Sequence, residues 1–172
     1  LRNEDSILPL PGGSRIALFG RSQFNYYKSG TGSGGMVNTA YVTGIREALQ
    51  KDGRFELNRE LTKAYETWLE SNPFYAGEGW AGEPWFQKEM PVSRELAEAA
   101  EKDSDTAVII VGRTAGEDKD NFAGEESYLL TKTEEEMLET VCSVFRRTVV
   151  LLNVGNISDM MWVDKCRPGA VL

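Results

Sequence analysis

The residues best suited to chemistry follow an apolar run in the second half of the chain. Residues 106–111 are apolar almost throughout, and Gly112 and Arg113 end the run before a cluster of charge that begins at Glu117. Such a run is typical of a parallel strand buried on both faces, and ligands of open α/β sheets bind just beyond the carboxyl ends of such strands. The sequence contains no histidine, so acid–base chemistry falls to carboxylates, Lys, Tyr or Cys. We therefore predict that Glu117 carries the chemistry, with a surface carboxylate in a turn as the alternative.

A glycine-rich segment after the first apolar strand is the second candidate. Gly30-x-Gly32-x-x-Gly35 has the spacing of a dinucleotide-binding fingerprint. In that motif the glycines lie directly at the strand–helix turn, whereas here about ten residues separate them from the strand. No Gly-Lys-Ser/Thr sequence follows, so the segment is not a phosphate P-loop. We expect either a loop whose backbone N–H groups approach a non-nucleotide ligand, or a flexible connection.

Two acidic patterns carry less weight. Asp118-x-Asp120 begins like a calcium loop, but Phe122 occupies a ligand position and Gly124 is displaced by one residue, so no metal site is predicted. Residues 134–139 include four glutamates, which we expect to form a solvated helix face without a functional role.

Residues 74–92 combine aromatic residues with glycine and proline and have no regular periodicity. Loops of this length in a compact domain are often functional. The aromatic rings of residues 74–86 fit either a platform for sugar rings or a small satellite core that holds the loop down. Glu78, between two glycines, is a rival carboxylate, and we rank it below Glu117 because it follows no strand.

Alternating strand and helix patterns position these segments. Ser93 and Thr131 are predicted helix N-caps, with Glu134 at the capping-box position after Thr131. The order implies an α/β fold in which helices cover both faces of a mainly parallel sheet, a Rossmann-like α/β sandwich. Residues 1–14 are expected to be a linker or lead-in, and residues 15–172 one domain that is incomplete at its C-terminal end. Strands are predicted at 15–19, 55–57, 106–111, 148–152 and 170–172, and helices at 60–69, 94–102, 160–165, after Thr131, and from Asn38 or Thr39 to Gly53.

Composition limits the partners. The 172 residues are 41% hydrophobic and 27% charged, with a net charge of −8, which argues against nucleic acid because phosphate contacts need clustered Lys and Arg. No apolar run approaches the length of a membrane span, and no cofactor is predicted. Cys142 lies on the apolar face of a helix pattern, which favours a buried free thiol over a disulfide with Cys166. Both ends look cut, so we expect part of a longer polypeptide, and its cellular location is left open with a slight preference for the cytoplasm.

Several motifs together resemble one family. Gly30-Thr31-Gly32-Ser33-Gly34 after a buried strand, Arg113-x-x-Gly116-Glu117-Asp118-x-Asp120, and residues 124–131 are similar to the α/β sandwich domain of glycoside hydrolase family 3, the family of many β-glucosidases. The resemblance spans nearly the whole chain and is poorest over residues 71–92. The family usually has glycine after the glutamate, where this chain has Asp118.

The resemblance implies one half of a retaining exo-acting β-glycosidase for a β-linked glucoside or short oligosaccharide. A (β/α)8 domain of the same polypeptide, absent from this sequence, would supply an Asp nucleophile, so the segment alone is expected to be inactive. Glu117 maps onto the general acid/base and Ser33 onto a sugar contact, with Gly32, Gly34, Arg113 and Asp118 in the substrate-binding part. In a closed site beside a second carboxylate, Glu117 should titrate high. The alternative is a non-catalytic α/β module that binds a nucleotide or another ligand, or a scaffold in which Glu117 is dispensable.

Overall fold

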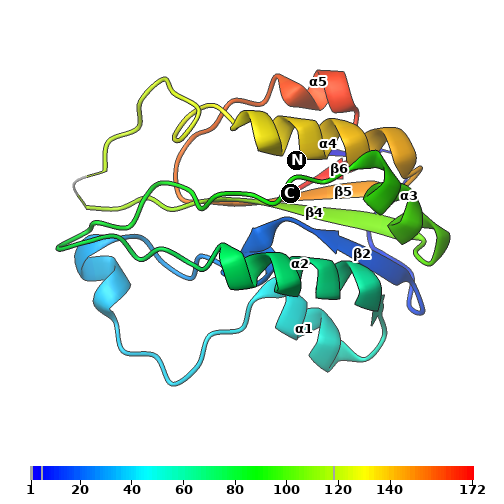
Figure 1. The fold of residues 1–172 in the computed structure, drawn as a ribbon, viewed down its shortest axis with the longest axis horizontal. Coiled ribbons are helices and arrows are strands. Elements are labelled where there is room, and N and C mark those ends of the chain that lie inside the picture. Colours follow the sequence, from blue (N-terminus) through cyan, green and yellow to red (C-terminus); the bar gives the residue numbers. More distant parts are fainter. Residues whose placement is uncertain (1, 5, 118) are drawn as a thin grey trace.

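The computed structural model describes residues 2–4, 6–117 and 119–172, which contain a six-stranded sheet (Figure 1). The order across the sheet is β1-β6-β5-β4-β2-β3, and neighbouring strands are parallel except for β1, which is antiparallel to β6. The predicted mainly parallel α/β fold is confirmed. The strands are β1 (Arg2–Asn3), β2 (Arg15–Phe19), β3 (Glu56–Leu57), β4 (Thr106–Arg113), β5 (Thr148–Val154) and β6 (Ala170–Val171).

Helices cover both faces of the sheet, as predicted. Helices α2 to α5 pack over one hydrophobic core, and α1 packs over the other. None of the described helices combines the length and the apolar character that a membrane span requires. The helices are α1 (Ile45–Asp52), α2 (Arg59–Ser71), α3 (Arg94–Lys102), α4 (Lys132–Val144) and α5 (Trp162–Cys166), with short 3-10 helices η1 (Arg21–Gln23) and η2 (Gly32–Met36).

The strand sequences explain the two cores. Successive side chains of a strand point to opposite faces, so Ala17 and Phe19 of β2 join the core under α2 to α5, while Ile16 and Leu18 join the other. All eight residues of β4 are buried. This burial on both faces is the property that its continuous apolar run predicts.

The lead-in contributes more than a linker. Arg2 and Asn3 pair with β6, the Glu4 N–H donates to the Gly169 carbonyl at 2.8 Å, and Ile7 is buried in the second core. The edge of β6 would otherwise present unpaired backbone groups, so residues of the predicted linker complete this side of the sheet.

Helix termini were predicted with mixed success. The Ser93 hydroxyl accepts from the Leu96 N–H, and Thr131 and Glu134 form the predicted capping box. The helix expected to begin at residues 38–39 instead begins after Gly44, which corrects that prediction. Residues 37–43 are exposed in irregular backbone, and the side chains of Val37, Tyr41 and Val42 lie outside both cores, so tertiary packing does not stabilise a helix there.

The long loops of the domain share one edge of the sheet. Strands β2, β4 and β5 are mutually parallel, so the loops that follow them at residues 20–44, 114–131 and 155–161 leave from the same side. Figure 1 shows these loops, and the irregular segment before α3, gathered at that end of the molecule. Open parallel sheets bind their ligands at this edge.

Candidate functional site

Glu117 lies on the loop that leaves β4. Gly116, immediately before it, forms isolated bridges with Thr31 and Lys119. Its φ of +142° suits glycine, and a Cβ there would lie 2.6 Å from both the N and the O of Thr31. Glu117 is exposed directly after this contact. Gly116 therefore lets the glycine-rich segment approach the backbone next to Glu117.

Two hydrogen bonds from backbone N–H groups join the glycine-rich loop to the loop that carries Glu117. The Thr31 N–H donates to the Ala115 carbonyl at 2.7 Å, and the Ser33 N–H donates to Glu117 Oε2 at 3.0 Å. Between them, Gly32 has a φ of +73°, and a Cβ at this position would lie 2.6 Å from Glu117 Cβ. Three residues singled out in the sequence, Gly32, Ser33 and Glu117, thus lie together although 84 positions separate the last two.

Gly34 and Asp118 were also predicted as site residues. Gly34 belongs to the same loop, and the space where a side chain would lie is open within 4 Å. Asp118 falls outside the described residues, so its expected role at the rim of the site stays a prediction.

The carboxyl of Glu117 is held as an anion in this chain. Hydrogen bonding to Ser33, first to its N–H and then to its hydroxyl, lowers the pKa of Glu117 below the usual value. The side chain is open to water, so burial opposes this effect only weakly. The shift is opposite to the raised pKa expected in a closed site, because shielding is what raises the pKa of a carboxyl.

Arg113 points into the protein interior and not toward a ligand. Its guanidinium is about 1% exposed and pairs with Glu134 through two bonds of 2.6 Å, Nη1 to Oε1 and Nη2 to Oε2. Nη2 also donates to the carbonyls of Glu125 and Leu129 at 3.3 Å. Arg113 therefore holds the two ends of the Glu117 loop together. This placement corrects the expectation that Arg113 binds substrate.

Glu134 corrects a second prediction. It was expected on a solvated helix face, but only about 4% of it is exposed. Its Oε2 accepts from the Thr131 N–H at 2.8 Å as well as from Arg113. The burial of Glu134 could have been predicted from its capping-box position and from Arg113 at the end of the preceding buried strand. Its place in a run of glutamates favoured a solvated helix face instead.

The irregular loop of residues 74–92 packs against the Glu117 loop along one part of its length. The Thr114 N–H donates to the Trp85 carbonyl at 2.9 Å. The Trp85 ring meets Phe122 edge-on, with centroids 6.1 Å apart, and Lys119 lies over the same ring. Tyr75 and Trp80, in contrast, are more than half exposed. Trp85 thus helps to hold the irregular loop against the Glu117 loop, as a small satellite core would. The rings of Tyr75 and Trp80 remain available for a ligand or a partner.

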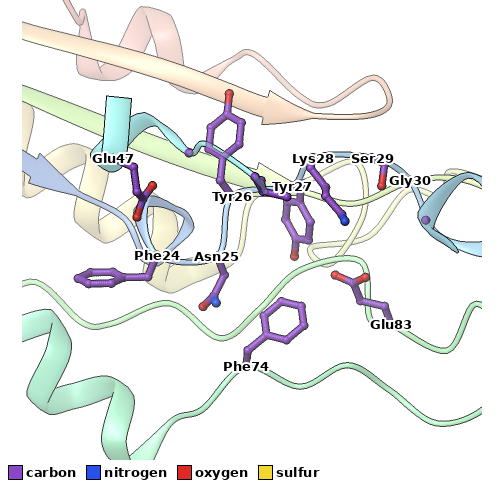
Figure 2. A pocket seen from close by; sticks show the side chains of 13 residues that line it. Phe24, Asn25, Tyr26, Tyr27, Lys28, Ser29, Gly30, Glu47, Phe74 and Glu83 are labelled. Carbon is purple, nitrogen blue, oxygen red and sulfur yellow. The ribbon is translucent and has the colours of Figure 1, made fainter. Parts of the chain in front are cut away.

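An open pocket of about 400 Å³ borders the glycine-rich loop at Gly30. Figure 2 shows the Tyr27 hydroxyl, the Glu83 carboxylate and the Phe74 ring converging on one side of it. The Tyr27 hydroxyl and Glu83 Oε1 are shielded from solvent and have no hydrogen-bond partner among the described residues. Burial raises the pKa of Glu83, and the charge of Lys119 opposes this shift. Neither Tyr27 nor Glu83 was identified from the sequence.

Within residues 2–4, 6–117 and 119–172, no group of three or more Cys, Asp or Glu side chains is arranged to hold a metal ion.

The profile of the glycosyl hydrolase family 3 C-terminal domain matches residues 1–172. The chain belongs to glycosyl hydrolase family 3. It is 49% identical over 168 residues to a β-glucosidase of Ruminococcus albus, covering 98% of this chain and 18% of that protein.

Solved structures of family 3 enzymes share the fold. A β-glucosidase from Paenibacillus barengoltzii has a TM-score of 0.95 and 47% identity, covering 99% of this chain and 19% of that one. β-Glucosidase 3B from Thermotoga neapolitana in complex with glucose has a TM-score of 0.84 and 29% identity, covering 99% of this chain and 24% of that one. This chain is therefore homologous to the α/β sandwich domain of family 3 β-glucosidases and spans about a fifth of the length of such relatives.

Proposed function

We propose that this chain is the sandwich domain of a retaining, exo-acting β-glucosidase and that Glu117 is its general acid/base. The observation that carries the proposal is the contact between Ser33 and Glu117, which joins the loops after β2 and β4 at the carboxyl edge of the sheet. Membership of family 3 supports a glycoside as the substrate.

In the proposed first step, an Asp carboxylate on a (β/α)8 domain of the same polypeptide attacks the anomeric carbon. As the glycosidic C–O bond breaks, Glu117 gives its proton to the departing oxygen, which otherwise leaves poorly. In the second step the Glu117 carboxylate takes a proton from water, the water oxygen bonds to the anomeric carbon, and the Asp is released. Two inversions retain the configuration, and a retaining enzyme holds its two carboxyls about 5–5.5 Å apart.

The first step requires a protonated Glu117, whereas in this chain Ser33 favours the anion. We propose that the second domain reverses the balance. It would exclude water from the exposed side of Glu117 and bring a second carboxylate near it, and both changes raise the pKa of a carboxyl. The proposed site is therefore an interdomain crevice.

Around Glu117, the glycine-rich loop is proposed to contact the sugar. Ser33 is exposed, and its hydroxyl, which lies toward the Glu117 carboxyl, is proposed to bind a sugar hydroxyl as well. The backbone of Gly32 and Gly34 would allow the sugar to approach closely, and Asp118 is proposed to lie at the rim. Arg113 has no direct contact in this proposal and acts by holding the Glu117 loop.

A Glu117→Ala variant of the polypeptide that carries this domain tests the assignment. Glucosides with poor alcohol leaving groups should lose activity by about 10²–10⁴-fold, the usual contribution of a general acid. Activated phenyl glucosides should still form the covalent intermediate, which should accumulate because no base remains to activate water. Azide needs no base, so it should restore turnover and give a glucosyl azide of retained configuration.

The matched control is Glu78→Ala. Glu78 is, like Glu117, a loop glutamate that follows a glycine, but it does not lie at the end of a strand. It should leave the dependence on the leaving group unchanged. Equal slowing of all substrates by Glu117→Ala, with no response to azide, would contradict the assignment.

A further inference from the structure

The glycine-rich loop is attached to the sheet at two places. At its far end, Thr31 and Ser33 bind Ala115 and Glu117. At its near end, the side-chain amide of Asn153 binds the backbone of Tyr27 from both sides. The Tyr27 N–H donates to Asn153 Oδ1 at 2.7 Å, and Asn153 Nδ2 donates to the Tyr27 carbonyl at 3.0 Å.

The Tyr27 contact lies where β4 and β5 end. Asn153 of β5 is directly paired with Gly112 of β4. The Tyr27 ring lies against Gly112, since a Cβ there would be 3.0 Å from Tyr27 Cε2. A side chain at position 112 would strike Ser22 Oγ first and would also crowd the Tyr27 ring. Tyr27 is therefore held on the two central strands, with its backbone bonded to Asn153 and its ring packed over Gly112.

We propose that Asn153 is a positioning residue, whose amide fixes Tyr27 and thereby places the glycine-rich loop where the Ser33 N–H meets Glu117. The inference concerns the placement of the loop, and it rests on the proposed function only in giving that placement a role in proton transfer.

Chain flexibility is the physical reason. Two of the six residues between Tyr27 and Gly34 are glycines, Gly30 and Gly32, and glycine loses more conformational freedom than other residues when a loop becomes ordered. A loop held only at Thr31 and Ser33 would be free at its near end, and the two bonds at its far end leave residues 28–30 many conformations. The two bonds from Asn153 fix the start of the loop, so fewer residues remain to be ordered.

Asn58 provides a matched control. Its side chain also makes several hydrogen bonds: Oδ1 accepts from the Leu61 N–H, and Nδ2 donates to the Ala100 carbonyl and to the Ser104 hydroxyl. These contacts join α2 to the end of α3, and Ser104 precedes β4 at the edge opposite to Glu117. Loss of the Asn58 bonds should therefore destabilise the domain without moving the glycine-rich loop.

The test compares Asn153→Leu with Asn58→Leu in the polypeptide that carries this domain. Amide hydrogen exchange of residues 28–36, measured by mass spectrometry, should be about tenfold faster in Asn153→Leu, the factor that corresponds to about 1.4 kcal/mol. Exchange of β4 should stay unchanged. In Asn58→Leu the melting temperature should fall while residues 28–36 exchange at the original rate.

Kinetics give a second readout. With a displaced loop, Asn153→Leu should lose about tenfold more activity on an alkyl glucoside than on an activated phenyl glucoside, whereas Asn58→Leu should affect both alike. If Asn153→Leu does not fold, Asn153→Ser, which keeps a polar group but cannot reach Tyr27 with two bonds, replaces it.

Unchanged exchange of residues 28–36 in either folded Asn153 variant overturns the inference. Faster exchange confined to this segment supports it, whatever the kinetics. If exchange rises but the leaving-group dependence does not, the anchoring by Asn153 holds and the placement of the loop has no role in proton transfer, while Glu117→Ala tests the acid separately.

Discussion

Two glutamates of this domain accept backbone N–H groups and yet have pKa shifts in opposite directions. Glu89 is buried, and its carboxylate accepts from the N–H groups of Arg21 and Met90 at 2.7–3.1 Å. Burial nevertheless raises the pKa of Glu89 to about 8. Glu117 accepts from Ser33 at 3.0 Å in the open, and its pKa is lowered. Hydrogen-bond donors are common to both, so access to water decides the direction.

The comparison indicates what Glu117 would need in order to act as the proposed proton donor. Glu89 is kept protonated near neutral pH by the protein around it, while Glu117 is exposed on this chain and would be shielded only by the proposed second domain. A covering domain would give Glu117 the shielding that Glu89 already has. Three predictions probe how strongly burial controls these carboxyls.

The largest effect is expected at the buried Glu134. Replacement of its partner in Arg113→Met leaves an unpaired buried carboxylate and should cost about 3–5 kcal/mol of unfolding free energy. The control, Arg15→Met, breaks the half-exposed pair with Asp105 and should cost far less, because water screens an exposed ion pair. Denaturant unfolding measures both. Adding Glu134→Leu to Arg113→Met should recover much of the loss, and equal costs for the two single variants would show that burial does not dominate.

The next effect concerns Glu89. Its folded pKa of about 8 lies above the unfolded value of about 4.3, so over this range the folded state binds more protons than the unfolded one. Stability should therefore fall as pH rises, at up to about 1.4 kcal/mol per pH unit, and level off above pH 8.

A Glu89→Gln variant, which cannot ionise, should remove this part of the pH dependence, because one amide oxygen can accept the bonds that Oε1 now accepts. Unfolding at a series of pH values between 5 and 9 measures it, with Glu101→Gln on the exposed side of α3 as the control. A wild-type profile with no decline across this range would refute the inverted shift.

The smallest effect is expected from alanine substitutions at two glycines with positive φ, which distinguish backbone strain from the loss of the contact between Ser33 and Glu117. Gly32 and Gly53 have nearly equal φ values, +73° and +70°, but a Cβ at Gly32 would strike Glu117 whereas the space at Gly53 is empty. Gly32→Ala and Gly53→Ala should each lose about 1 kcal/mol or more through backbone strain. Only Gly32→Ala should displace Glu117 from Ser33 and raise the Glu117 pKa, as measured by NMR titration. A similar titration of Glu117 in both variants would mean that its pKa does not depend on the Ser33 contact.

The sequence by itself determined the architecture and the main candidate. The apolar run of residues 106–111 became the fully buried β4, and Ser93 and Thr131 became the caps that their types predict. These features are readable because strand burial and helix capping depend on residues close together in the chain. The motif around Glu117, together with the glycine-rich segment, was enough to indicate the family.

Only the tertiary structure decided what each polar side chain faces. Arg113 and Glu134 seemed to be a ligand contact and a solvated residue, and they are partners in the interior because β4 and the first turn of α4 meet there. The pairing of Asn153 with Tyr27 spans 126 positions, and no local pattern encodes such a contact. The pKa of Glu117 likewise depends on which groups and how much water surround it in space, and that is a property of the packed chain.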